Sequence, residues 1–184
     1  GAPNEGLIPD GFSDGGLADK VPEYTNIYWT LNGMLAAIEA ARWLGENATA
    51  DRWQREYDDF HATFRRAAQR DTKTDAQGNR CVPIRMAKGE GIPPQKAQWA
   101  FCHSVFPGKV FAPDDPMVIG NMAMLRAVED QGLVFDTGWL KNGIWTYFGG
   151  FYGNAWLWLG DGAKAVSTLY AFGNHASPLL CWRE

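Results

Sequence analysis

Few cysteines, no long apolar run and no cluster of positive charge mark this sequence, and each absence excludes a class of protein. The three cysteines stand far apart, so neither a disulfide framework nor a CxxC metal site is predicted, and we expect buried free thiols. No run of about twenty apolar residues occurs, so no segment is expected to cross a membrane. Because the net charge is −4 and no basic run is present, we expect no binding to nucleic acid.

Motifs for several common chemistries are missing as well. The sequence contains no phosphate-binding loop, no dinucleotide fingerprint and no Ser-His-Asp set. The adjacent pair Cys102 and His103 is not at the spacing of metal ligands, so neither a metal nor another cofactor is predicted. The chain also lacks an initiating methionine and a signal peptide, and we expect it to be processed or excised from a longer protein.

Tryptophan, in contrast, is abundant, with nine residues in a chain of 184, a length typical of one domain with its own core. We interpret most of these side chains as packing between helices. The functional alternative is a pocket in which aromatic rings stack against the apolar face of a sugar or of another flat ligand. The composition alone leaves both interpretations open.

Two segments repeat one pattern, in which an apolar helix leads through a tight turn of glycine and an acidic residue into a more polar helix. The turns are Trp-Leu-Gly-Glu at 43–46 and Trp-Leu-Gly-Asp at 158–161. Over 27–44, apolar residues cover almost every face, which is typical of a buried helix, whereas 49–67 carries one aromatic stripe among charges, as an outer helix does. Repeated helical hairpins predict an all-α fold of the (α/α)-barrel type.

Helix boundaries follow from the same periodicity and from capping residues. Thr25 and Thr49 are expected to cap the first two helices, and the Asp-Pro pair at 115–116 starts a later one. The glycines at 149–150 are expected to bend or break the second inner helix. The remaining expected elements are an extended piece at 82–86, a short helix at 97–105 and helices at 116–132, 144–159 and 162–172.

The short glycine turns indicate where a site should lie. Both turns share one end of the bundle, so the connections 1–24, 71–113, 131–143 and 173–184 are expected to gather at the other end, around a site. These connections interleave carboxylates with tryptophan and histidine, which is typical of glycosidic-bond cleavage. In that reaction one carboxylic acid protonates the leaving oxygen, and a second carboxylate activates water or attacks the sugar.

The candidate residues divide by role. As catalytic carboxylates we predict Asp14, Asp136 and Glu184. The predicted substrate-binding residues are Glu23, Trp99, His103, Trp139, Trp145, His175 and Trp182. Structural roles are the alternatives: a turn position for the two aspartates, a helix N-terminus for the glutamate at 23, and hydrogen bonding for the histidines.

Six short segments, spread over nearly the whole chain, carry a resemblance to a known family. They lie at 23–26, 43–45, 94–100, 120–121, 137–140 and 177–184. In their order and spacing the chain resembles the six-hairpin glycosidases, most nearly the α-L-rhamnosidase-like branch. The resemblance implies an (α/α)6 toroid, and this chain is similar to about half of one, cut at both ends.

The same resemblance implies a mechanism and a site. It implies inverting hydrolysis of a glycoside, without a cofactor, in a secreted or periplasmic protein. By the family's pattern Glu184, close to Trp182, is the catalytic base, and Asp14 is the nearest candidate for the general acid. Because half a barrel leaves apolar helix faces uncovered, we also expect self-association or contact with missing flanking segments.

Three functions are consistent with the sequence, and each has a carbohydrate as its partner. The first is an inverting glycoside hydrolase, or a fragment of one, which the excess of carboxylates in the long connections favours. The second is a non-catalytic carbohydrate-binding or scaffold module, which the lack of a clear acid motif favours. The third is a polysaccharide lyase, with a histidine or tyrosine base and an arginine that neutralises an acidic sugar.

Overall fold

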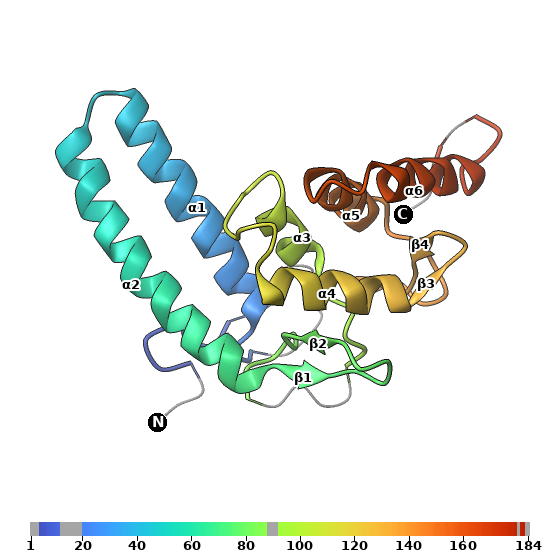
Figure 1. The fold of residues 1–184 in the computed structure, drawn as a ribbon, viewed down its shortest axis with the longest axis horizontal. Helices are drawn as coiled ribbons and strands as arrows, with labels where there is room; N and C mark the ends of the chain where they lie inside the picture. Colours follow the sequence, from blue (N-terminus) through green and yellow to red (C-terminus); the bar gives the residue numbers. More distant parts are fainter. Residues whose placement is uncertain (1–3, 12–19, 88–91, 180, 183–184) are drawn as a thin grey trace.

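The computed structural model describes residues 4–11, 20–87, 92–179 and 181–182, and helices dominate this part of the chain (Figure 1). The helices are α1 (Tyr24–Trp43), α2 (Asn47–Asp71), α3 (Trp99–Val105), α4 (Pro116–Ala127), α5 (Thr146–Trp158) and α6 (Gly162–Asn174). Strands of two residues form two antiparallel hairpins, namely β1 (Lys73–Thr74) with β2 (Arg80–Cys81) and β3 (Glu129–Asp130) with β4 (Leu133–Val134). The predicted all-α class is therefore confirmed.

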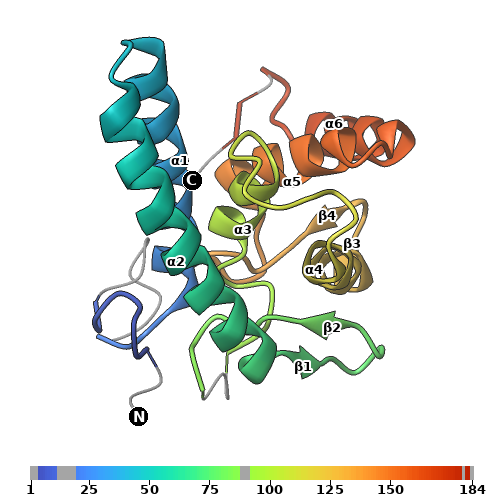
Figure 2. The ribbon, with the colours of Figure 1, turned by 60° about the vertical axis from the view of Figure 1, so that its left-hand side comes forward.

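The two repeated patterns form helical hairpins, α1 with α2 and α5 with α6 (Figure 1 and Figure 2). Gly45 and Gly160 adopt φ angles of +82° and +87°, in the left-handed region that glycine occupies without steric cost. Asp161 then caps α6 by accepting a hydrogen bond from the amide of Lys164. The tight glycine turns predicted from the sequence are thus confirmed.

Helices α1 and α3 run in the same direction, as two side-chain contacts show. Near the start of both helices, Tyr28 meets Phe101 with 5.5 Å between the ring centroids. One turn further along both helices, Asn32 donates a hydrogen bond of 2.9 Å to the hydroxyl of Ser104. Residue numbers therefore rise together along the two helices.

Helix α5 continues this parallel arrangement on the other side of α3. The ring of His103 lies 4.9 Å from that of Phe151, and Phe106, directly after α3, stacks on Trp158 at 5.3 Å. The three helices α1, α3 and α5 thus begin at one end of the molecule, which we call the proximal end. Because α1 and α5 lead into the glycine turns, those turns lie at the opposite end, as predicted.

Long connections meet at the proximal end. The amide of Tyr24, the first residue of α1, donates to the carbonyl of Ile84 at 2.9 Å. The amide of Gly138, in the connection before α5, donates to the carbonyl of Lys96, just before α3, at 2.7 Å. Described parts of both long internal connections therefore surround the starts of the parallel helices.

An aromatic core holds α1, α2 and α3 together. Tyr28 packs edge-on against Phe64 of α2 and Phe101 of α3, with ring centroids 5.8 and 5.5 Å apart. The Phe111 ring closes the group at 5.9 Å from both phenylalanines. The edge-to-face pairs that Tyr28 makes add stability beyond the area they bury.

The prediction that α1 is buried is wrong for most faces of its second half, where Ile38 and Ala41 are buried but the end of the helix is exposed. Trp43 is 85% exposed, and Leu44, at the end of the helix, is 67% exposed. Helix α3 has only 7 residues against 20 in α1, so the far half of the α1–α2 hairpin projects beyond it (Figure 1). Sequence periodicity reports how apolar a helix is, but not whether a neighbour is long enough to cover it.

Three local predictions also need correction. Thr25 and Thr49 do not cap their helices, since α1 begins at Tyr24 and α2 at Asn47. Thr25 is instead 1% exposed and lies within the first turn of α1. In the same turn, the amide of Tyr24 already donates to the carbonyl of Ile84, in the connection before α3. The glycines at 149–150 do not break α5, which is continuous through them. Asp115, in contrast, caps α4 as predicted, accepting from the amide of Met117 at 2.8 Å.

Candidate functional site

A continuous row of aromatic rings crosses the three parallel helices. Neighbouring rings in this row have centroids between 4.7 and 5.1 Å apart. We call the row the aromatic ladder; in order, its members are Trp29, His103, Phe151, Tyr147, Trp145 and Trp139. Three of the predicted substrate-binding residues, His103, Trp139 and Trp145, therefore belong to the same row of rings.

Helix geometry explains how the ladder forms. Helices α1 and α3 each supply one ring, Trp29 and His103, which meet at 4.7 Å because the helices run side by side in the same direction. Tyr147 and Phe151 are four residues apart on α5, so their rings lie one above the other on one helix face. The ladder thus passes from α1 across α3 to α5 and then to the connection before α5.

The proximal end of the ladder is the exposed end. Trp139 is 51% exposed and Tyr147 is 47% exposed, whereas Trp145 between them is only 7% exposed. Trp99, which is completely buried at the start of α3, supports Trp145 edge-on at 4.8 Å. A buried indole therefore carries two rings that are each about half exposed.

Two sequence motifs fix the position of Trp139. Gly138 has a φ of +60°, and a Cβ at this position would lie 2.9 Å from the ring of Trp145. The side-chain ammonium of Lys96 donates to the carbonyl of Leu140 at 2.6 Å. The segments 94–100 and 137–140 therefore interlock, and glycine is required where the backbone approaches the buried indole.

Buried amides tie the same connections to α4. Asn121 donates from its side chain to Gln98 Oε1 at 3.2 Å and accepts from the amide of Val82 at 2.9 Å. Gln98 in turn donates to the carbonyl of Pro94 at 3.0 Å. Each polar group in this network has its partner, so the network stabilises the connections instead of offering free donors to a ligand.

Glu23, a predicted substrate-binding residue, is 2% exposed at the start of α1. Its backbone forms a bridge with Arg85. Glu23 directly precedes the first residue of α1, at the helix N-terminus named above as its structural alternative, although its side chain makes no capping hydrogen bond. Its burial places it beneath the proximal surface rather than on it.

Asp136, one of the predicted catalytic carboxylates, is engaged within its own loop. Its Oδ1 accepts a short hydrogen bond from the amide of Asn142, and its own amide donates to the carbonyl of Gly143 at 3.0 Å. The residue adopts a φ of 59°, which aspartate tolerates better than most side chains. These contacts match the turn interpretation given above.

His175 and Trp182 do not belong to the ladder. His175 follows α6 directly, and its ring nitrogens lie 2.8 Å from the carbonyl of Ala171 and 3.1 Å from Gln131 Oε1. The indole of Trp182 donates to the carbonyl of Phe172 at 3.1 Å. Both residues thus secure the end of α6, in keeping with the structural alternative for the histidine.

Two predicted catalytic residues, Asp14 and Glu184, lie outside the described residues. Within the described residues no group of three potential metal ligands occurs. Burial raises the pKa of the Cys81 thiol to about 11 and that of Cys102 still further. The expectation of buried thiols is wrong for Cys181, which is exposed.

Three ladder residues, Trp29, Tyr147 and Phe151, were not predicted as site residues. The spacing of Tyr147 and Phe151 by four positions was a usable signal, because it places both rings on one face of a helix. For Trp29 no signal existed in the sequence, since its partner His103 belongs to a helix far along the chain.

Comparisons with models of protein families, with curated proteins and with solved structures found no match to this chain. Among the described residues, no helix combines the length and the apolar character that crossing a membrane requires.

Proposed function

We propose that this chain binds carbohydrate through the exposed end of the aromatic ladder, as part of a glycoside hydrolase-like domain built from about half of an (α/α)6 toroid. The observation that carries the proposal is the pair of accessible rings, Trp139 and Tyr147, mounted on the buried Trp145. Aromatic faces of this kind stack on the apolar faces of sugar rings.

Rigidity supports this proposal. A binding surface loses less free energy on association when its side chains are already ordered. Trp145 is held edge-on by Trp99, and the loop that carries Trp139 is fixed through Lys96 and Gly138. The exposed rings are therefore preorganised, although they lie next to long connections.

Hydrolysis is the catalytic form of the proposal, with Glu184 as the general base of an inverting reaction. Trp182, two residues earlier, is bound to Phe172 near the end of α6. That phenylalanine packs against Gly149 in the first turn of α5, which is part of the proximal end. Asp136 and Asp14 are the alternative candidates for the catalytic carboxylate. If no carboxylate is catalytic, the chain is a binding module that holds carbohydrate without hydrolysing it.

The binding proposal is tested by titrating oligosaccharides against the intact protein, with tryptophan fluorescence and calorimetry as readouts. Trp139→Ala removes an exposed ladder ring, and affinity is expected to fall about threefold to tenfold, from the typical value of one aromatic contact. Trp43→Ala is the matched control, because this indole is 85% exposed but lies at the opposite end of α1. Equal affinities for the two variants, or no sugar binding by the parent protein, would contradict the proposal.

The catalytic form is tested with aryl glycosides and the variant Glu184→Gln. This change keeps the size of the side chain and removes its basicity, so hydrolysis should slow about a hundredfold to ten-thousandfold while sugar binding persists. If the variant hydrolyses the glycoside as fast as the parent protein, Glu184 is not the general base, and Asp136 or Asp14 becomes the candidate. Binding without turnover by the parent protein would favour the non-catalytic module.

A further inference from the structure

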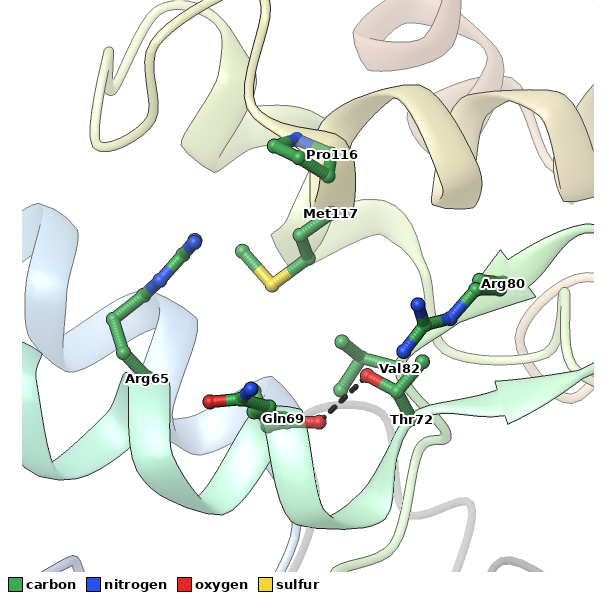
Figure 3. Close-up of a pocket in the computed structure, with 8 residues that line it drawn as sticks. Arg65, Gln69, Thr72, Arg80, Val82, Pro116 and Met117 are labelled. Atoms are coloured by element: carbon green, nitrogen blue, oxygen red, sulfur yellow. Dashed lines mark hydrogen bonds between the residues drawn. The ribbon is translucent and has the colours of Figure 1, made fainter.

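A second candidate site lies in the outer layer of the molecule, away from the ladder. A pocket of about 330 Å³ opens between the C-terminal part of α2, strand β2 and the start of α4 (Figure 3). This volume is at the lower end of the range for small-molecule sites. The pocket is lined by Arg65, Ala68, Gln69, Thr72, Arg80, Val82, Pro116 and Met117.

Arg80 supplies an uncompensated positive charge. Its side chain extends from β2 towards Thr72 and Val82 in the pocket (Figure 3). No carboxylate within 4.0 Å forms an ion pair with it in the described part of the chain. The backbone of Arg80 is held in place, since Gly120 of α4 approaches it so closely that a Cβ there would lie 1.8 Å from the Arg80 carbonyl oxygen.

Arg65 supplies a second guanidinium, which is already oriented. One of its terminal nitrogens, Nη1, lies 2.5 Å from Asp115 Oδ2. The other oxygen of Asp115 accepts from the amide of Met117 and is therefore occupied in capping α4. A guanidinium has five N–H donors, so the pair with Asp115 leaves donors of Arg65 for a further acceptor.

The charge balance of the lining residues defines the kind of ligand. They include two arginines and no carboxylate, and Asp115 compensates only one of the two charges. Gln69 adds a neutral amide that faces the pocket (Figure 3). Val82, Met117 and Ala68 supply apolar surface beside the polar groups, while the side chains of Gln69 and Arg80 are themselves exposed.

We infer that this pocket is an anion-binding site, in which Arg80 binds a small oxyanion, either a carboxylate or a phosphate group, while Arg65 and Gln69 line the opposite side of the pocket (Figure 3). The planar guanidinium matches both groups because each presents two oxygens to its parallel N–H bonds. The inference does not depend on carbohydrate binding at the ladder, since none of the residues involved belongs to the ladder.

The test is calorimetric titration of the intact protein with sodium phosphate and, separately, with sodium acetate, at an ionic strength kept constant with chloride. We expect saturable binding of at least one of the two, and the stronger binder identifies the group. Arg80→Gln is expected to weaken this binding by at least about tenfold, because charge-assisted hydrogen bonds are lost. Arg55→Gln is the matched control, since it removes the same charge from an exposed position of α2, and should leave the affinity unchanged.

Nitrogen-15 NMR of the arginine side chains provides a second readout in the unaltered protein, independent of whether the variant folds. The side-chain N–H signal of Arg80 is expected to shift on addition of the anion, and that of Arg55 is not. Absence of saturable binding by both anions, equal weakening by both substitutions, or an unshifted Arg80 signal at saturation would each overturn the inference.

Discussion

His103 shows how a single side chain takes its properties from tertiary neighbours. Its ring lies between those of Trp29 and Phe151, at 4.7 and 4.9 Å, and its Nδ1 is buried without a partner among the described residues. Burial lowers the pKa of His103 below its ordinary value of 6.5, because the charged imidazolium loses hydration between aromatic rings. The neutral ring is thus the form that joins α1 to α5.

This lowered pKa predicts that the protein loses stability in mild acid. Between the lowered pKa of the folded chain and the ordinary value of 6.5, the unfolded chain binds a proton at this histidine while the folded chain does not, so the free energy of unfolding falls as the pH is lowered through this range. His103→Phe keeps an aromatic ring and removes the titration, and its unfolding free energy should depend less on pH. Urea unfolding at a series of pH values measures the difference.

Part of the pH dependence should persist in that variant. His61 also has a lowered pKa, caused first by burial and then by the nearby Arg65. The variant His61→Phe is therefore expected to show a reduced dependence of its own. Identical pH profiles for the parent protein and His103→Phe would show that the ladder does not disfavour the charged ring.

At the scale of elements, the α5–α6 hairpin depends on one glycine and tolerates another. A Cβ at Gly149 would lie 2.0 Å from the ring of Phe172, whereas at Gly150 it would meet no atom within 4 Å. Both residues are in the same α-helix. The first glycine is thus required for packing between the two helices, and the second is not.

Opposite effects are therefore expected from two equivalent substitutions. Gly149→Ala should lower the free energy of unfolding by about 1–3 kcal/mol, because Phe172 must leave its place to avoid overlap. Gly150→Ala should raise it by about 0.5–1 kcal/mol, because alanine restricts the unfolded chain and favours the helix. Chemical denaturation followed by circular dichroism measures both values, and equal effects would contradict the packing that the α5–α6 hairpin shows.

At the scale of the whole molecule, apolar side chains remain uncovered along α6. Val166, Leu169 and Tyr170 follow the i, i+3, i+4 spacing of one helix face and are 52%, 69% and 71% exposed. The far end of the α1–α2 hairpin exposes Trp43 and Leu44 as well. Contiguous apolar surface of this kind is unusual on a monomer and favours association.

We accordingly predict that the isolated chain self-associates as its concentration rises. Light scattering after size exclusion should give a mass that increases with loading, and Leu169→Glu should reduce this increase, because a charge then interrupts the α6 face. Ser167→Glu is the matched control, with the same added charge at an exposed position outside that face. A constant monomer mass for the parent protein would refute the prediction.

The sequence by itself determined the helices and the turns between them. Periodicity located α1, α2, α5 and α6 to within a few residues, and Gly45 and Gly160 marked the left-handed turns. The helix predicted at 116–132 ends earlier, at Ala127, because strand β3 begins at Glu129. Such signals are readable because a helix face repeats every 3.6 residues and a cap acts within one turn. The repeat also indicated correctly that described parts of the two long internal connections lie opposite the glycine turns.

Only the tertiary structure decided which side chains meet. The ladder brings together positions 29, 103 and 151, and the pocket brings together positions 65, 80 and 117. Within each set the positions are far apart in the sequence. The length of α3 decided that the second half of α1 is buried on one face only. Contacts between distant segments depend on the direction, length and packing of whole helices, and one sequence read residue by residue does not contain those quantities.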